Sequence, residues 1–237
     1  MRLSVLFISS LLGLAACQTA PTSPAPTTEP TTTVTATPTA PVPAPTTAGQ
    51  PRIVFFGNSL TAAYGLEPEQ GFSAIIERKL DSLGYAYDVI NAGLSGETTT
   101  GGLDRIDWIL REPVDIFVLE LGGNDGLRGT DPALTEQNLD GMINKVLDKY
   151  PEATVILAGM QAPPNMGAEF TTAFKGIYPR LAAKYDRVEL IPFLLEDVGG
   201  IPSMNLPDGI HPTAAGHRLL ARNVWAVLSE EIERRAL

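Results

Sequence analysis

Cysteine, histidine and basic residues are scarce in this chain of 237 residues. The single cysteine, Cys17, excludes an intrachain disulfide framework and a cysteine-rich metal site. With only two histidines, His211 and His217, no closed metal shell can form around Asp208, and we expect no metal. Lys and Arg number 17 against 27 Asp and Glu, giving a formal net charge of −10. This charge argues against nucleic acid or anionic lipid headgroups as the main partner.

The apolar run near the N-terminus, residues 3–14, is too short to span a bilayer as a mature helix. Arg2 precedes it and small residues follow it, which is typical of a secretory signal peptide. The stretch Leu14-Ala15-Ala16-Cys17 resembles the lipobox of bacterial lipoproteins, which implies a signal peptide over 1–16 and a lipid on Cys17. The alternative is an ordinary signal peptide with an incidental cysteine. Gln18 is not the aspartate associated with inner-membrane retention, so we expect an outer-membrane anchor that faces the periplasm.

Residues 17–50 are expected to form a lipidated cysteine followed by a disordered linker. Pro and Thr make up 20 of the 33 residues in 18–50, and Glu29 is the only charge there. Such a stretch cannot bury enough apolar surface to offset the entropy of ordering. At about 3 Å per residue it could reach roughly 100 Å. It would tether the remainder, 51–237, which is long enough for one domain with a substantial core.

Apolar runs alternate with helical patterns throughout residues 51–237. Five short apolar runs predict strands at 53–56, 85–92, 114–121, 154–159 and 188–192. Helical patterns lie between and after them at 72–84, 97–112, 131–150, 173–186 and 213–235. This alternation predicts an α/β sandwich with a parallel sheet. In such sheets ligands bind beyond the carboxyl ends of the strands, so chemistry is expected there.

Four small or polar clusters follow predicted strands and should share one edge of the sheet. They are Gly57-Asn58-Ser59-Leu60, Gly93-Leu94-Ser95-Gly96-Glu97, Gly122-Gly123-Asn124-Asp125 and Asp208-Gly209-Ile210-His211-Pro212. Ester hydrolysis by a serine needs a nucleophile, a base, a group that orients the base, and donors for the developing oxyanion. The four clusters supply residue types suited to each of these parts.

The general base must be His211 or His217. His211 is preferred because Asp208 precedes it by three residues within one loop, so a single turn can bring carboxylate to imidazole. His217 falls within the last predicted helix, where a surface or packing role is expected. Gly96 can offer a backbone N–H, and Asn124 a side-chain amide, to an oxyanion.

Each cluster also has a purely structural interpretation. Ser59 could cap a helix, Asp208 could cap a turn, Ser95 could be the N-cap of the helix that follows it, and "GGND" could be a plain turn. Taken singly, none of these motifs decides between the structural and the functional interpretation.

Together the four clusters resemble the SGNH, or GDSL-type, hydrolase superfamily, in its arylesterase and thioesterase I/lysophospholipase L1 branch. The resemblance covers about 52–232 and extends to "NAGLSGETTTGGLDRI", "LELGGNDGLRG" and "LPDGIHPTAAGH". It implies a flavodoxin-like α/β/α three-layer sandwich with a five-stranded parallel sheet, without metal or cofactor. It also implies Ser59 as nucleophile, His211 as base and Asp208 as its orienting group. Ser59, Gly96 and Asn124 would form the oxyanion hole.

The first cluster departs from the family pattern, because Asn58 stands where the family usually has aspartate. Asn keeps a carbonyl acceptor but loses the charge. We therefore expect activity within about a hundredfold of an Asn58→Asp variant. Thr130, where a bulkier apolar residue would favour long acyl chains, hints at shorter or aryl esters.

The predicted function is a lipid-anchored serine esterase for small aryl or short-to-medium acyl esters, with lysophospholipids and thioesters as further candidates. Two alternatives are a non-catalytic lipid-anchored binding or scaffold protein and an acetyl esterase that acts on polysaccharide.

Overall fold

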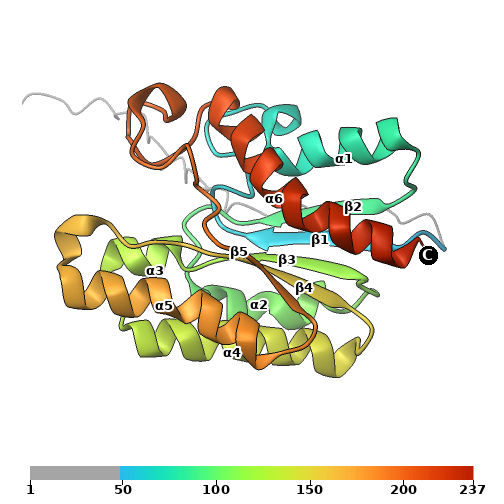
Figure 1. The fold of residues 1–237 in the computed structure, drawn as a ribbon, viewed down its shortest axis with the longest axis horizontal. Helices are drawn as coiled ribbons and strands as arrows, with labels where there is room; N and C mark the ends of the chain where they lie inside the picture. Colours follow the sequence, from blue (N-terminus) through green and yellow to red (C-terminus); the bar gives the residue numbers. More distant parts are fainter. Residues whose placement is uncertain (1–48, 237) are drawn as a thin grey trace, which may run out of the picture. The chain divides into compact units, whose positions relative to one another are not determined.

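Five parallel strands form the central sheet of the computed structural model, which describes residues 49–236 (Figure 1). In spatial order they are β2 (Asp88–Gly93), β1 (Arg52–Gly57), β3 (Ile116–Glu120), β4 (Thr154–Ala158) and β5 (Val188–Ile191). Neighbouring strands pair in parallel throughout. All five predicted strands are confirmed, and the order 2-1-3-4-5 is that of flavodoxin-like folds.

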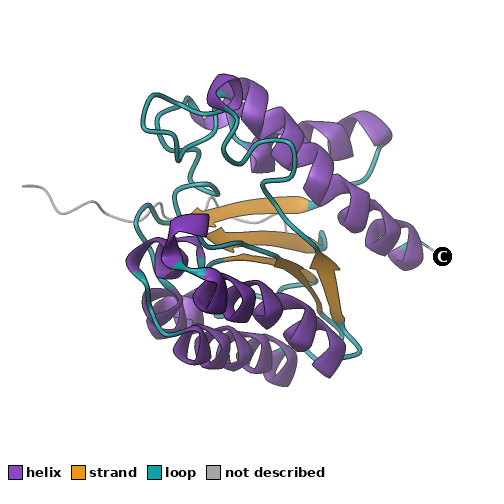
Figure 2. Ribbon diagram, turned by 60° about the vertical axis from the view of Figure 1, so that its left-hand side comes forward, coloured by secondary structure: helices purple, strands orange, loops and turns teal. Residues whose placement is uncertain are grey.

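Helices cover both faces of this sheet (Figures 1 and 2). α1 (Phe72–Leu83) and α6 (Ala214–Arg235) pack against each other on one face. The other face carries α2 (Thr99–Ile109), α4 (Pro132–Lys149) and α5 (Ala168–Lys184), with α4 packed between its two neighbours. The predicted three-layer α/β/α sandwich is confirmed. Among residues 49–236, no helix is long and apolar enough to cross a membrane.

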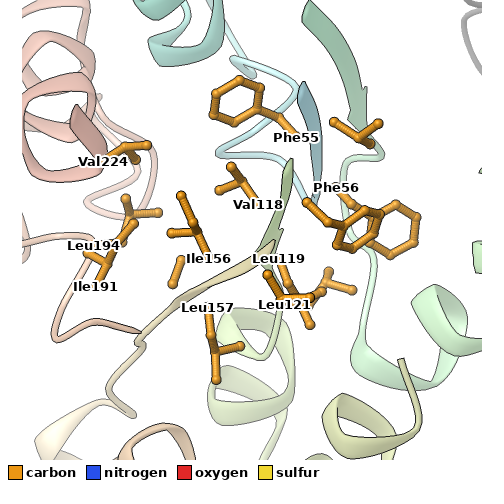
Figure 3. Close-up of a cluster of buried hydrophobic side chains, with 14 of the residues drawn as sticks. Phe55, Phe56, Val118, Leu119, Leu121, Ile156, Leu157, Ile191, Leu194 and Val224 are labelled. Atoms are coloured by element: carbon orange, nitrogen blue, oxygen red, sulfur yellow. The ribbon is translucent and has the colours of Figure 1, made fainter. Parts of the chain in front are cut away.

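The three central strands are apolar on both faces because each face lies under helices. Their side chains line up across the sheet in two rows (Figure 3). The register pairs give one row of Phe55, Val118 and Ile156 and another of Phe56, Leu119 and Leu157. All six side chains are almost completely buried. Burial of a side chain of this size contributes about 1.5–3 kcal/mol, so this core holds the strand ends in place.

Two helix boundaries follow the sequence signals. Asp131 Oδ1 accepts a hydrogen bond from Ala133 N at 2.9 Å, and Pro132 is the first residue of α4. Gly84 ends α1 with φ of 79°, a left-handed conformation that favours glycine.

The segment after β1 does not start a helix, as the structural alternative for Ser59 required. Residues 58–65 form successive turns, because Ala63 and Gly65 have left-handed φ values of 54° and 78°. Asn58 Oδ1 also accepts a hydrogen bond from Leu60 N at 3.0 Å, a local bond that competes with helix formation. The interpretation of Ser59 as a helix cap is therefore wrong.

Two further helical features differ from the prediction. "GGND" opens a short helix, α3 (Gly123–Arg128), and is not a plain turn. The N-cap of α2 is Thr98, whose side chain accepts from Gly101 N, so Ser95 does not have that role.

The predicted signal peptide, Cys17 and most of the linker lie outside the described residues. The lipid anchor and the domain boundaries at 16 and 50 accordingly stay predictions.

Candidate active site

The candidate site lies where the strand order reverses. β1 pairs with β2 along one edge and with β3 along the other. The connection from β1 to β2 and the connection from β2 to β3 therefore run in opposite directions across the sheet. Such a reversal leaves a crevice beyond the carboxyl ends of the two central strands. Ser59 follows β1 and Asn124 follows β3, and both side chains line one cavity of about 480 Å³.

Ser59, His211 and Asp208 form one continuous hydrogen-bonded chain. Ser59 Oγ lies 2.9 Å from His211 Nε2, and His211 Nδ1 lies 2.7 Å from Asp208 Oδ2. A carboxylate at Nδ1 holds the proton on that nitrogen, which leaves Nε2 as the acceptor for the serine hydroxyl. Hydrogen bonds from the His211 ring and from the backbone N–H groups of His211 and Ile210 lower the pKa of Asp208 to about 2. The carboxylate is therefore ionised at neutral pH.

Asp208 has both of the roles that the sequence left open. Its Oδ1 accepts hydrogen bonds from Ile210 N at 2.9 Å and His211 N at 3.0 Å, as a turn-capping aspartate does. Its Oδ2 is then directed at the imidazole. The capping contact fixes the carboxylate relative to the backbone of the residue that it orients.

The loop that carries this pair is closed by its own hydrogen bonds. Leu206 N donates to His211 O at 2.7 Å, and Thr213 N donates to Met204 O at 2.8 Å. Asn205, which is buried, donates to Val198 O at 2.7 Å and to Ile201 O at 2.9 Å. The loop is thus a compact unit between β5 and α6.

His217 is a packing residue, which is one of the two roles that we expected for it from the sequence. It is 1% exposed, and its Nδ1 accepts a hydrogen bond from Phe72 N at 3.2 Å. Its ring stacks on the Phe72 ring with centroids 6.1 Å apart. Burial lowers the pKa of His217 to about 4, so the ring is neutral near pH 7. The expectation of a surface position is wrong.

The predicted oxyanion donors are the backbone N–H groups of Ser59 and Gly96 and the side-chain amide of Asn124. Gly96 has φ of 82°, which requires glycine, and a Cβ there would meet no atom within 4 Å. Glycine is therefore needed for backbone conformation. Within residues 49–236, no protein acceptor lies on the backbone N–H of Ser59 or Gly96. Asn124 belongs to α3, which follows β3, and its Nδ2 donates to Glu97 O at 2.8 Å. The second hydrogen of that amide is free for a ligand.

The Gly96 loop is anchored by an ion pair between buried Glu97 and half-buried Arg105. Glu97 accepts two hydrogen bonds from the Arg105 guanidinium, which also donates to Ala92 O at 2.8 Å and lies over the Phe56 ring. Burial raises the pKa of Glu97, and Arg105 opposes that shift. The contacts tie the loop to both β1 and β2.

Glu120 is a site residue that the sequence analysis missed. It lies at the end of β3 and is 1% exposed. Its carboxylate accepts four hydrogen bonds from Asn58 and Thr61, the residues just before Ser59 and just after Leu60. Oε1 accepts from Asn58 Nδ2 at 2.8 Å; Oε2 accepts from Asn58 N at 3.1 Å, Thr61 N at 3.3 Å and Thr61 Oγ1 at 2.8 Å. Burial raises the pKa of Glu120 to about 7, although these bonds act in the opposite direction. A Cβ on Gly57 would overlap Glu120 Oε2, so glycine is required there.

The cavity beside Ser59 has mostly apolar walls. Among its lining residues are Leu60, Leu127, Met160, Ala162 and Ile210. Thr130, expected beside the acyl group, does not line it; its backbone N donates to Asp125 O at 2.9 Å. This cavity therefore gives no support to the prediction about chain length drawn from Thr130, which stays a prediction. Within residues 49–236, no three His, Cys, Asp or Glu side chains are arranged to hold a metal ion.

Known proteins share this architecture and these motifs. The model of the GDSL-like Lipase/Acylhydrolase family matches residues 55–219. Esterase TesA of Pseudomonas aeruginosa is 43% identical over 182 residues, which are 76% of this chain and 89% of that protein. Arylesterase of Vibrio mimicus is 36% identical, covering 68% and 80%. Thioesterase 1/protease 1/lysophospholipase L1 of Escherichia coli is 37% identical, covering 73% and 81%.

Solved structures agree with the sequence comparisons. A crystal structure of TesA superposes with a TM-score of 0.70 at 43% identity, covering 74% of this chain and 96% of that one. The chain belongs to the GDSL-like Lipase/Acylhydrolase family, also called SGNH hydrolases. Within that family it is a serine esterase, and this assignment favours hydrolysis over the non-catalytic binding function.

Proposed function

We propose that Ser59, His211 and Asp208 carry out ester hydrolysis through an acyl-enzyme. The observation that carries this proposal is the unbroken series of contacts from Asp208 Oδ2 through the imidazole to Ser59 Oγ, at 2.7 and 2.9 Å. His211 Nε2 takes the hydroxyl proton as Ser59 Oγ bonds to the ester carbonyl carbon. It returns that proton to the alcohol oxygen as the carbon–oxygen bond breaks. Water then attacks the acyl-serine by the same proton route.

The oxyanion of each tetrahedral intermediate would lie against the backbone N–H groups of Ser59 and Gly96 and the Asn124 amide. Their support is rigid: Asn124 is held by Glu97 O, and the loop is tied down through Glu97 and Arg105. Preorganised donors need no reorganisation when negative charge develops. Loss of one such donor typically costs about 3–4 kcal/mol of transition-state stabilisation.

Aryl and short-to-medium acyl esters are the substrates we assign. The apolar walls of the cavity beside Ser59 suit an acyl group, and the relatives are named esterase, arylesterase and thioesterase/lysophospholipase. Lysophospholipids and thioesters share the same acyl chemistry. Coenzyme A thioesters are scarce outside the cytoplasm, so oxygen esters fit the expected location better.

That location is the cell envelope, with a lipid on Cys17 and the domain in the periplasm at the outer membrane. Its support is the lipobox-like stretch and the Pro- and Thr-rich residues after it. Palmitate labelling of cells that express the full chain tests the anchor. Label is expected on the wild type and not on Cys17→Ser; equal labelling of both excludes the anchor.

Hydrolysis of p-nitrophenyl acetate by the full chain tests the mechanism. Ser59→Ala and His211→Ala should each lower kcat by at least about a thousandfold, because members of a triad act as a unit. Ser95→Ala is the matched control, since Ser95 is an exposed serine that also follows a strand. A fluorophosphonate should label the wild type and not Ser59→Ala. Retained hydrolysis in Ser59→Ala contradicts the mechanism.

A further inference from the structure

Tyr64 is an exposed aromatic residue that contacts the proposed general base. Its side chain is 52% exposed, yet its ring centroid lies only 4.5 Å from that of His211, with the two planes inclined by 39°. A tyrosine this exposed contributes little to the core. Its position beside His211 therefore needs another explanation than folding.

The backbone holds this ring in place. Tyr64 N donates a backbone hydrogen bond to Ser59 O at 3.0 Å, which fixes the tyrosine relative to the proposed nucleophile. Ala63 and Gly65, its two neighbours, both have left-handed φ values. Gly65 packs closely against Leu206, in the loop that carries His211. Tyr64 thus bridges the nucleophile segment and the base segment.

The stereochemistry of acyl transfer defines which part of an ester meets Tyr64. The oxyanion lies toward Gly96 and Asn124, and the acyl group lies in the cavity, which Tyr64 does not line. The remaining substituent is the alcohol, whose oxygen must lie beside His211 Nε2 to receive its proton. The alcohol part therefore leaves along the imidazole, where Tyr64 is the adjacent exposed ring.

Resting on the proposed function, we infer that Tyr64 binds the alcohol part of the ester and selects aromatic alcohols by ring stacking. Aromatic pairs prefer offset or edge-to-face contacts with centroids roughly 4.5–7 Å apart, a geometry open to a phenyl group beside an exposed phenol. In hydrolysis this selection acts on acylation alone, because the alcohol has departed before water attacks, and it acts equally on the reverse of that step, the attack of an added alcohol on the acyl-enzyme.

Two acetates with different alcohols test this role in the full-length protein. Phenyl acetate and 2,2,2-trifluoroethyl acetate give the same acetyl-enzyme, so the ratio of their kcat/KM values reports only on the alcohol. Tyr64→Leu should lower this ratio about tenfold, equivalent to about 1.4 kcal/mol. Tyr64→Phe, which keeps the ring, should retain the preference. Trp108→Leu is the matched control, because Trp108 is 41% exposed and lies near the other end of α2 from the Gly96 loop.

A second readout separates alcohol binding from support of His211. Benzyl alcohol and water compete for the same acetyl-enzyme and use the same base, so their product ratio does not depend on the efficiency of His211. Tyr64→Leu should lower the yield of benzyl acetate relative to acetate. An equal loss of kcat/KM for both esters, with an unchanged product ratio, overturns the role of Tyr64. Failure of the fluorophosphonate to label Ser59 refutes the proposed function instead, whatever the ester ratio.

Discussion

Exchange of the two side chains at positions 58 and 120 tests how the nucleophile segment is held. In the wild type, Asn58 Nδ2 donates to Glu120 Oε1 at 2.8 Å. Glu120→Gln places an amide nitrogen against that donor, whereas Asn58→Asp places a carboxylate oxygen against a carboxylate. Combining the two substitutions reverses donor and acceptor, since the introduced amide at position 120 would donate to the introduced carboxylate at position 58. The hydrogen bond that Leu60 N donates to the side-chain oxygen at position 58 can form in every variant, because Asn and Asp both carry that oxygen.

The expected magnitudes follow from burial. Position 58 is 2% exposed and position 120 is 1% exposed, so neither mismatch can be relieved by water. A buried polar group without a partner costs about 1–3 kcal/mol, so the mismatch itself should cost each single variant about 2 kcal/mol of unfolding free energy at pH 8, separate from the gain when Glu120→Gln removes the buried charge. Restoration of the pair in the double variant should remove both mismatch costs, which corresponds to a coupling energy of up to about 4 kcal/mol. The activity of each single variant should fall and that of the double variant should recover.

Urea unfolding at pH 8 and p-nitrophenyl acetate hydrolysis on the four proteins measure the cycle. The exposed ion pair of Lys145 and Asp107 is the control, and its cycle should give at most about 1 kcal/mol. Single-variant losses at positions 58 and 120 that add within about 0.5 kcal/mol would refute the reasoning. At pH 5 the carboxyl introduced by Asn58→Asp can share a proton with Glu120, so this variant should stay within about a hundredfold of wild-type activity.

Three further predictions concern pH and the cavity. The pKa of Glu120 in the folded protein is about 7, against an ordinary 4.5, so its contribution to stability is complete below pH 4.5 and is lost as pH rises through 7. The wild type should therefore lose about 3 kcal/mol of unfolding free energy between pH 4 and 8, measured by urea unfolding, and Glu120→Gln should not show this loss. The pKa of His217 is shifted in the opposite direction, to about 4 from 6.5, so its contribution to stability is complete above pH 6.5 and is lost as pH falls through 4. His217→Asn should therefore abolish a loss of about 3 kcal/mol of unfolding free energy at low pH, and a pH profile of stability equal to that of the wild type would contradict this. In a series of p-nitrophenyl esters from acetate to butyrate, each added methylene that is buried in the cavity should raise kcat/KM by up to about fourfold. Ala162→Leu should reduce this increase per methylene, and an increase equal to that of the wild type would exclude this cavity as the acyl site.

The sequence predicted the sheet and the position of the site for the same reason. Short apolar runs between helical patterns indicate parallel strands buried on both faces, and parallel strands bring their carboxyl ends to one edge. Ser59, Asn124 and His211 follow three different strands, so a correct strand assignment was enough to bring them together.

What the sequence could not show depends on contacts between distant residues. Glu120 is one of two charges in the predicted strand 114–121, and its partner Asn58 lies 62 positions away. A carboxylate within a strand that is otherwise buried was the available signal, because burial of a charge requires partners. The helix α3 contains two glycines, which disfavour helix, and it forms because Asp125 docks on Thr99 N and Oγ1.

The loop that holds Asp208 and His211 has a consequence for how the enzyme loses activity. Asp208 is bonded to the ring and the backbone of His211, and the loop is closed by bonds within its own span. Ser59 belongs to a different segment, fixed to β3 through Glu120. When thermal motion displaces the loop, base and orienting carboxylate move as one body, and only the distance from Nε2 to Oγ grows. Heating should therefore disconnect the nucleophile while the imidazole is still paired, an inactive state that cooling reverses without refolding the domain.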